Sequence, residues 1–333
     1  MQKHSWRIAA TQQGAALDRF LANVLHKSPG REIALGQVRK LIEAGAVSLD
    51  GRRERSVSKT LKAGMRVEVF VDLAKFATSS LQEPARTVSK IFAWSPARIL
   101  FEDEWLIVVD KPVGLPTQPT LDESRANVFG TLKAFLQKRD GGSPYLGLHH
   151  RLDRDTSGVL LFTKSEKANA GVAELFASRA LQKTYQALCL AKSSCPDDWE
   201  VKNCLGVVTR AGRNSKFGAV RSGGDPAHTS FKVLERFPGV LLVEARPHTG
   251  RTHQIRVHLA EDGRPIMGDI FYGGPAVLKP VAGTAVHFPR VMLHAAALAF
   301  SHPITKAELT VRSPLPEDFA GCLAQIRKIP GVL

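Results

Sequence analysis

Two aspartates stand two residues apart in the segment HRLDRDTSG, which covers residues 150–158. Carboxylates in such a setting serve as nucleophiles or general bases, and the arginines at positions 151 and 154 favour their ionised form. The small-residue turn leads into the apolar stretch GVLLF, so we expect the motif on a loop beside a strand, where functional side chains are common. Asp153 is the candidate for chemistry, whereas Asp155, directly before Thr-Ser-Gly, suits a role in the turn.

A second polar pattern, HTGRTHQIRVH at residues 248–258, begins with a Thr-Gly turn. We expect the residues after the turn to form a strand, in which alternate side chains share a face. Thr252, Gln254 and Arg256 would then point to one side. A buried arginine on that side requires a carboxylate partner, and Asp153 from the first motif is a candidate for it.

Neither pattern predicts a metal centre or a cofactor. The histidines of the second pattern, His248, His253 and His258, are spaced by five residues, which puts successive side chains on opposite faces of a strand. The four cysteines form no Cys-x-x-Cys pair, which argues against a zinc ribbon or a disulfide framework and favours a reducing compartment. We therefore expect no cofactor and no metal.

Tyr185 lies in the apolar segment KTYQALCL, residues 183–190. A tyrosine within such a strand usually belongs to the hydrophobic core. The functional alternative is a ring that stacks on a base turned out of an RNA helix, with its hydroxyl close to the reacting atoms. The residues alone leave both interpretations open.

The chain of 333 residues is strongly basic, with a formal net charge of +15. Such a charge favours a polyanionic partner, because neutralising phosphates releases their counterions. No apolar run approaches the length of a membrane span, and the N-terminal segment lacks the apolar core of a signal peptide. We therefore expect a cytoplasmic protein without a membrane partner, and a monomer.

Residues 14–72 are predicted to form a small α/β unit. Apolar residues recur at helical spacing in two segments, and an Asp-Gly turn and two strand patterns follow. This order of elements resembles the small RNA-binding domain named after ribosomal protein S4. The resemblance implies RNA contacts for the cations around the second helix and the hairpin, although a solvated charged face is the alternative. These cations are Arg31, Arg39, Lys40, Arg52 and Arg53.

Residues 73–97 lack a sustained period and contain many serines, alanines and prolines, as expected of a linker. From residue 98 to residue 330, strand patterns joined by turns predominate. Helical patterns are limited to residues 127–139 and 166–179. This composition favours an α+β domain with a central mixed, mostly antiparallel sheet over a doubly wound parallel sheet.

Four blocks follow one another in this region: HRLDRDTSG, KTYQA, GRTHQIRVHLA with a downstream GD and YG, and LHAAALAFSHP. In this order they resemble the sequence blocks of the RluA-type pseudouridine synthases, over about residues 98–316. The resemblance implies a pseudouridine synthase fold, a basic cleft, and the isomerisation of uridine in RNA without a cofactor. With an S4-like domain ahead of it, large-subunit ribosomal RNA is the expected partner, and transfer RNA is the alternative.

The resemblance also implies roles for particular residues. Asp153 matches the catalytic aspartate, and Tyr185 matches the tyrosine that stacks on the flipped uracil. Arg256 matches the basic residue that pairs with the catalytic carboxylate. Arg151 matches an arginine that can fill the space left by the flipped base, and Arg251 is a further expected residue of the RNA-binding cleft.

Two other functions compete with this hypothesis. A non-catalytic RNA-binding protein of the same fold would be expected to lack Asp153, Tyr185 or Arg256, and all three are present. A hydrolase could use Asp153 and Asp155 as an acid and base pair. That function requires one protonated carboxyl, and two carboxyls on an arginine-rich loop would both be ionised.

Overall fold

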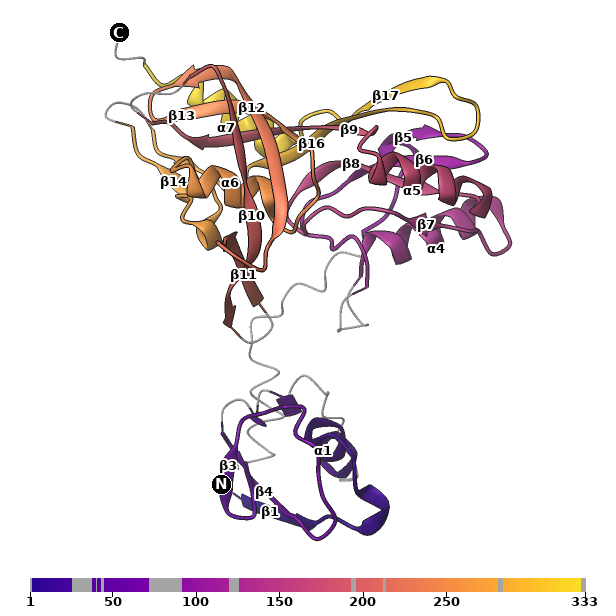
Figure 1. The fold of residues 1–333 in the computed structure, drawn as a ribbon, viewed down its shortest axis with the longest axis vertical. Helices are drawn as coiled ribbons and strands as arrows, with labels where there is room; N and C mark the ends of the chain where they lie inside the picture. Colours follow the sequence, from indigo (N-terminus) through magenta and orange to yellow (C-terminus); the bar gives the residue numbers. More distant parts are fainter. Residues whose placement is uncertain are drawn as a thin grey trace. The chain divides into compact units, whose positions relative to one another are not determined.

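The computed structural model describes residues 2–25, 38–39, 41–42, 45–71, 92–119, 126–192, 196–211, 214–280 and 284–330. The chain divides into two compact units, Met1–Ile91 and Phe92–Leu333 (Figure 1). Arg31, Lys40 and most of the expected linker at 73–97 lie outside the described residues. The last part of that expected linker belongs to the second unit, because Trp94 is buried in its core.

The N-terminal unit contains helix α1 (Leu17–Leu25), the short helix η1 (Ala10–Gln12) and an antiparallel sheet of order β1-β4-β2-β3. The apolar stripe of α1 is buried in one cluster with the inner face of the sheet. Strand β1 pairs with β4 ahead of the boundary expected at residue 14, so the unit includes it. The strands are β1 (Gln2–Arg7), β2 (Val47–Leu49), β3 (Arg52–Glu54) and β4 (Arg66–Val71).

The Asp-Gly turn of this unit has the predicted conformation. Asp50 and Gly51 join β2 to β3 with φ angles of 48° and 81°, and a two-residue hairpin of this type requires positive values at both positions. The Asp50 carboxylate also accepts a hydrogen bond from the backbone N–H of Arg66 at 2.8 Å. The turn therefore fixes the register of the hairpin that presents Arg52 and Arg53, which are both exposed.

The C-terminal unit is built on an eleven-stranded sheet of order β11-β10-β12-β13-β9-β16-β8-β6-β5, with β17 beside β16 and β7 beside β8. All described pairings are antiparallel except that of β8 with β16. A separate hairpin pairs β14 with β15. The strands are β5 (Ile99–Glu102), β6 (Leu106–Lys111), β7 (Gly147–Leu148), β8 (Ser157–Thr163), β9 (Gln182–Leu190), β10 (Asp198–Ala211), β11 (Asn214–Ala219), β12 (Asp225–Phe237), β13 (Val240–Pro247), β14 (Val277–Leu278), β15 (Val286–His287), β16 (Leu293–Ser301) and β17 (Glu308–Arg312).

Helices cover the sheet on both faces (Figure 1). On β6, Ile107 packs in one apolar cluster with residues of α4, and its neighbour Val108 packs in another with residues of α5. Within the described residues, no helix is long and apolar enough to cross a bilayer. The helices are α4 (Val128–Asp140), α5 (Asn169–Ala177), α6 (Gln254–Glu261) and α7 (Glu317–Ile326), with short helices η2 (Pro96–Arg98), η3 (Glu166–Ala168) and η4 (Ile270–Tyr272).

The prediction of a strand after the Thr-Gly turn at 249–250 is wrong, because Gln254–Glu261 form helix α6. The alternation of Ile255, Val257 and Leu259 with polar residues imitated a strand. In the structure α6 is buried almost all round: Ile255 and Leu259 join the main core cluster, and Val257 joins a second one. A helix enclosed in this way needs apolar residues on more than one face, so its sequence does not show a single stripe.

Candidate active site

A buried lysine fixes the backbone of the HRLDRDTSG loop. Lys111, at the end of β6, is fully buried. Its ammonium donates to the carbonyl oxygens of Pro112, Arg154 and Thr156 at 2.8–2.9 Å. Three carbonyl acceptors satisfy the three donors of an ammonium group. The loop is thereby held at the end of β6 although it lies more than forty residues away in the sequence.

Gly158 lets the end of this loop enter the sheet. Strand β8 runs parallel to β16 here, with Ser157 opposite His294 and Gly158 opposite Ala295. A β-carbon at Gly158 would stand 2.1 Å from the Ala295 carbonyl oxygen, and the residue has a φ of +113°. Only glycine tolerates both conditions. The Ser157 hydroxyl is also within 2.9 Å of His294 Nδ1, which ties the two strands together.

Asp153 and Asp155 have different surroundings, as the sequence suggested. The Asp155 carboxylate accepts two hydrogen bonds from its neighbour Arg154, at 2.9 and 2.8 Å. The carbonyl of Asp153 accepts a hydrogen bond from the backbone N–H of Thr156, which closes the turn. Its carboxylate lines a pocket and lies 3.1 Å from Nη1 of Arg256. The predicted contact of Asp153 with Arg256, 103 residues away, is therefore present.

Arg256 is held by a second carboxylate that is almost fully buried. Asp269 accepts from Arg256 Nε at 2.7 Å and from Nη2 at 2.8 Å, and Asp269 is 1% exposed. The guanidinium also packs over the Tyr272 ring, 5.0 Å from its centre. Burial alone would lower the pKa of Arg256, but the hydrogen bonds and charges of Asp269 and Asp153 outweigh it and raise the pKa. The cation facing Asp153 is therefore permanent and fixed in direction.

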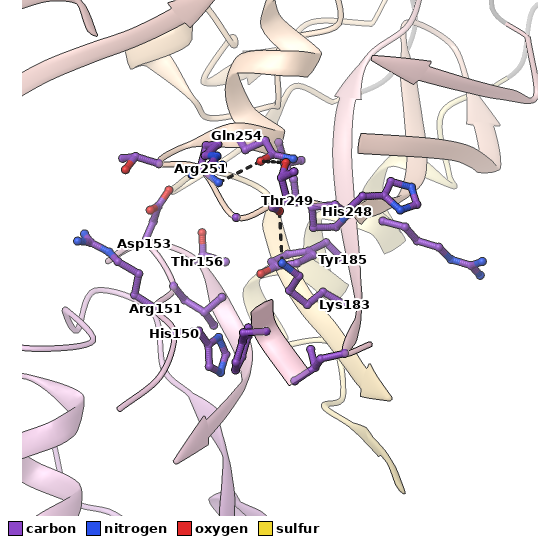
Figure 2. Close-up of a pocket in the computed structure, with 18 of the residues that line it drawn as sticks. His150, Arg151, Asp153, Thr156, Lys183, Tyr185, His248, Thr249, Arg251 and Gln254 are labelled. Carbon is purple, nitrogen blue, oxygen red and sulfur yellow. Dashed lines mark hydrogen bonds between the residues drawn. The ribbon is translucent and has the colours of Figure 1, made fainter. Parts of the chain in front are cut away.

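Tyr185 faces the same pocket from β9 (Figure 2). The cavity has a volume of about 830 Å³, and Asp153 and Tyr185 lie on opposite sides of it. Burial raises the pKa of Tyr185, and the Asp153 charge raises it further, so the phenol stays protonated at neutral pH. The lining of this pocket also includes the His150 ring, whose Nε2 accepts a hydrogen bond from the backbone N–H of Leu161 at 2.9 Å. Burial lowers the pKa of His150 to about 3, so this ring is neutral.

The other expected RNA-binding residues fall into four groups. Arg151 and Arg251 are exposed and line the pocket. Arg251 donates to the carbonyl of Pro226 at 3.1 Å, which directs its side chain along β12. In the N-terminal unit Arg39 forms an ion pair with the buried Asp18 at 2.7 Å. Arg52 and Arg53 have exposed side chains on β3, and Arg31 and Lys40 lie outside the described residues.

Asp269, Tyr272 and His253 also belong to the site, and the sequence patterns assigned them no role in it. Asp269 and Tyr272 are the D and the Y of the GD and YG pairs in the third block. These pairs contributed to the family resemblance, but neither residue was given a role. His253 has a left-handed φ of 57°, and its Nδ1 lies 2.9 Å from the Tyr272 hydroxyl. Its Nε2 lies 3.7 Å from Asp153. Their nearness to Asp153 depends on the tertiary structure, in which α6 lies beside the HRLDRDTSG loop, and so it could not be predicted from the sequence.

The three histidines considered for a metal site do not share a centre. His258 lies within 3.0 Å of Thr229 and Asn203, away from His253. Among the described residues, the group of metal-ligating side chains within mutual reach is Glu200, His228 and His248. In that group the Lys202 ammonium and the Ser230 hydroxyl already contact the Glu200 carboxylate, at 2.5 and 3.1 Å.

Comparisons with known proteins agree with this architecture. Residues 105–261 match the family described as RNA pseudouridylate synthase. Human RNA pseudouridylate synthase domain containing 4 has a similar structure, with a TM-score of 0.56 and 28% identity, covering 69% of this chain and 93% of that one. Human RNA pseudouridylate synthase domain containing 1 gives a TM-score of 0.53 and 26% identity, covering 69% and 90%. The α+β sheet predicted from the sequence is the pseudouridine synthase fold.

Curated relatives cover more of the chain. A ribosomal large subunit pseudouridine synthase D from Nitrosomonas europaea is 39% identical over 71% of this chain and 67% of its own. A ribosomal large subunit pseudouridine synthase C from Yersinia pestis is 32% identical over 96% of this chain and 95% of its own. The chain belongs to the RluA-type family of pseudouridine synthases, and it is an isomerase that acts on RNA. The family predicted from the four blocks is confirmed.

Proposed function

We propose that this enzyme converts uridine to pseudouridine in large-subunit ribosomal RNA and that Asp153 acts at C1′ of the ribose. The observation that carries the proposal is the pairing of Asp153 with a fixed arginine in a pocket whose opposite side is Tyr185. The names of the relatives support ribosomal RNA as the substrate. Transfer RNA remains the alternative, and the same assay tests it.

The reaction is an internal rearrangement of the nucleotide. The N1–C1′ bond breaks with its electron pair leaving on the uracil, the uracil turns, and C5 forms a new bond to C1′. The proton on C5 is then lost and N1 gains one, so no atom is added or removed overall. We propose Asp153 as the nucleophile or base at the sugar, and Arg256 as the group that keeps its carboxylate ionised and oriented.

We propose that the target uridine leaves its helix to reach Asp153. A base inside a stacked helix exposes neither C1′ nor both of its faces to a side chain, so enzymes that react there turn the nucleotide out. The pocket volume of about 830 Å³ falls in the range of small-ligand sites and leaves room for one nucleoside. Tyr185 would stack on the uracil, and Arg151, exposed at the rim, would occupy the space left in the helix.

The test compares Asp153→Asn with Asp155→Asn. We expect Asp153→Asn to abolish pseudouridine formation in ribosomal RNA fragments and in transfer RNA while RNA binding remains. Asp155→Asn keeps substantial turnover, because the Asp155 carboxylate accepts its hydrogen bonds from Arg154 of the same loop and makes none to Arg256. Mapping of pseudouridine across all RNAs, in cells with and without the gene, identifies the target. Full activity of Asp153→Asn would refute the mechanism, and sites confined to transfer RNA would refute the ribosomal substrate.

We also propose that residues 14–72 form an S4-like RNA-binding domain and that residues 98–330 form the catalytic domain. The exposed Arg52 and Arg53 on β3 would contact phosphates, together with Arg31 and Lys40. Arg39 is less available, because it pairs with Asp18. Deletion of residues 1–72 should weaken binding to large structured RNA and flatten its dependence on salt. Unchanged binding after the deletion would refute an RNA role for this unit.

A further inference from the structure

Lys183 presents an ammonium group to the pocket, and no carboxylate among the described residues forms an ion pair with it. It lies on β9, two residues before Tyr185, and is half-buried. Within the described residues its Nζ has one hydrogen-bond partner, the carbonyl oxygen of Thr249 at 3.3 Å (Figure 2). An ammonium carries three donors, so two remain for a ligand. Buried charges in proteins are normally paired, and an unpaired one at a site calls for a partner that the substrate supplies.

The charges around Lys183 strengthen this conclusion. Among the pocket-lining residues in the described part of the chain, the carboxylate is that of Asp153, and Arg256 already pairs with it. Burial lowers the pKa of Lys183, and no carboxylate offsets that effect. Gly250 lies beside the Nζ of Lys183, and a β-carbon on this glycine would stand 3.7 Å from that nitrogen. The space around the ammonium therefore opens to the pocket.

The position of Lys183 selects the part of the nucleotide that it meets. Residues two apart on a strand share a face and lie about 7 Å apart, so Lys183 and Tyr185 flank the same region of the pocket. The arginines of the lining other than Arg256 are exposed at the rim, where a polyanionic backbone would run. These are Arg151, Arg179, Arg246 and Arg251. A half-buried ammonium beside the stacking ring therefore meets the base rather than a phosphate.

From this placement we propose that Lys183 is a catalytic residue that binds a carbonyl oxygen of the target uracil and stabilises the negative charge it acquires when the N1–C1′ bond breaks. The inference rests on the proposed function. Bond cleavage leaves the electron pair on the uracil, where it spreads from N1 to the O2 and O4 oxygens. Lys183 donates hydrogen bonds to that charge and transfers no proton. It is thus a preorganised donor aimed at charge that develops only in the transition state.

The experiment measures single-turnover rates and RNA affinity for Lys183→Met, with Lys183→Arg and Lys192→Met beside it. Lys192 follows β9 and pairs with Asp262 at 3.6 Å, outside the pocket lining, so its variant controls for loss of a lysine charge. We expect Lys183→Met to bind RNA as the parent does and to react about 10²- to 10³-fold more slowly. Lys183→Arg recovers most of the loss, because it keeps the cation, and Lys192→Met reacts at the parent rate.

A second substrate separates leaving-group stabilisation from a general structural role. The fluorine of 5-fluorouridine withdraws electrons and stabilises the uracil anion, so this base needs the ammonium less. We therefore expect the rate defect of Lys183→Met in N1–C1′ cleavage to shrink in RNA that carries 5-fluorouridine. A misfolded variant would lose the same factor with both substrates and would not bind RNA.

Two results would overturn the proposal. One is a Lys183→Met enzyme with weaker RNA binding and an unchanged rate, which would make Lys183 a phosphate contact. The other is an equal rate defect with uridine and 5-fluorouridine. Neither result bears on the proposed function, which stands or falls on whether the parent enzyme forms pseudouridine in ribosomal RNA.

Discussion

Asp269→Asn tests whether Arg256 depends on its buried partner. In the parent, Arg256 donates hydrogen bonds to the two Asp269 oxygens at 2.7 and 2.8 Å. The substitution keeps the size of the side chain but removes its charge and one of these two acceptors. Breaking a buried ion pair costs about 3–5 kcal/mol of stability. Asp153 remains 3.1 Å from the guanidinium as a second counter-charge, and asparagine retains one acceptor, so we expect about 3 kcal/mol, near the lower end.

The measurement is denaturant unfolding of the C-terminal unit, with the single-turnover rate recorded on the same samples. Glu235→Gln is the control: it also breaks a two-bond arginine pair, with Arg327, but on the surface, where such pairs contribute little. We expect the rate of Asp269→Asn to fall as well, because Arg256 is free to turn and no longer presents Nη1 to Asp153 in one direction. Unfolding indistinguishable from that of Glu235→Gln would refute the reasoning.

Two further predictions concern the supports of the site. Gly158→Ala should destabilise the C-terminal unit by more than about 1 kcal/mol, because its φ of +113° disfavours alanine and its β-carbon meets the Ala295 carbonyl at 2.1 Å. Gly142→Ala should cost about 1 kcal/mol, because its φ of +65° lies in the left-handed region and its surroundings are open; equal losses in unfolding experiments would contradict the clash. His150 is neutral when folded but takes up a proton below its ordinary pKa when unfolded, so acid destabilises the parent as pH falls from 6.5 towards 3. This effect lowers the free energy of unfolding at pH 5 by about 2 kcal/mol relative to pH 7, and we expect His150→Gln to lose that part of the pH dependence. If the free energy of unfolding changed with pH equally in both proteins, this explanation would be refuted.

The sequence correctly placed the HRLDRDTSG segment on a loop beside a strand, because the features that indicate this are local. A turn of small residues before an apolar strand can be read from nine letters, and the structure has the HRLDRDTSG loop directly before β8. The different surroundings of Asp153 and Asp155 could also be expected on local grounds, since an aspartate beside Arg154 bonds to it without any help from the fold. The contact between Asp153 and Arg256 followed from the need of a buried arginine for a carboxylate.

The helix that carries Arg256 was missed for a physical reason. The periodicity of apolar residues reveals a helix when one face is buried and the other is exposed to solvent. Helix α6 has no solvent-exposed face over Gln254–Leu259. The buried polar residues are satisfied by partners from elsewhere in the chain: Gln254 donates to Thr229, and the His258 ring contacts Thr229 and Asn203. No pattern within ten residues contains that information. The same limit explains why Asp269 and Lys111 were not assigned.

The two carboxylates on Arg256 leave Asp153 with one oxygen held and one available. Asp269 accepts from the Nε and Nη2 side of the guanidinium, and Asp153 accepts a single bond, from Nη1 to its Oδ2. His253 faces that same Oδ2 at 3.7 Å. Within the described residues, Oδ1 has no hydrogen-bond partner, and the carboxylate lines the pocket. A bidentate pair between Asp153 and Arg256 would have occupied both oxygens and blunted the reactivity of the acid. Because Asp269 already holds the guanidinium through two bonds, one bond is enough for Arg256 to orient Asp153, and in the proposed mechanism the unoccupied Oδ1 is the oxygen that meets the sugar.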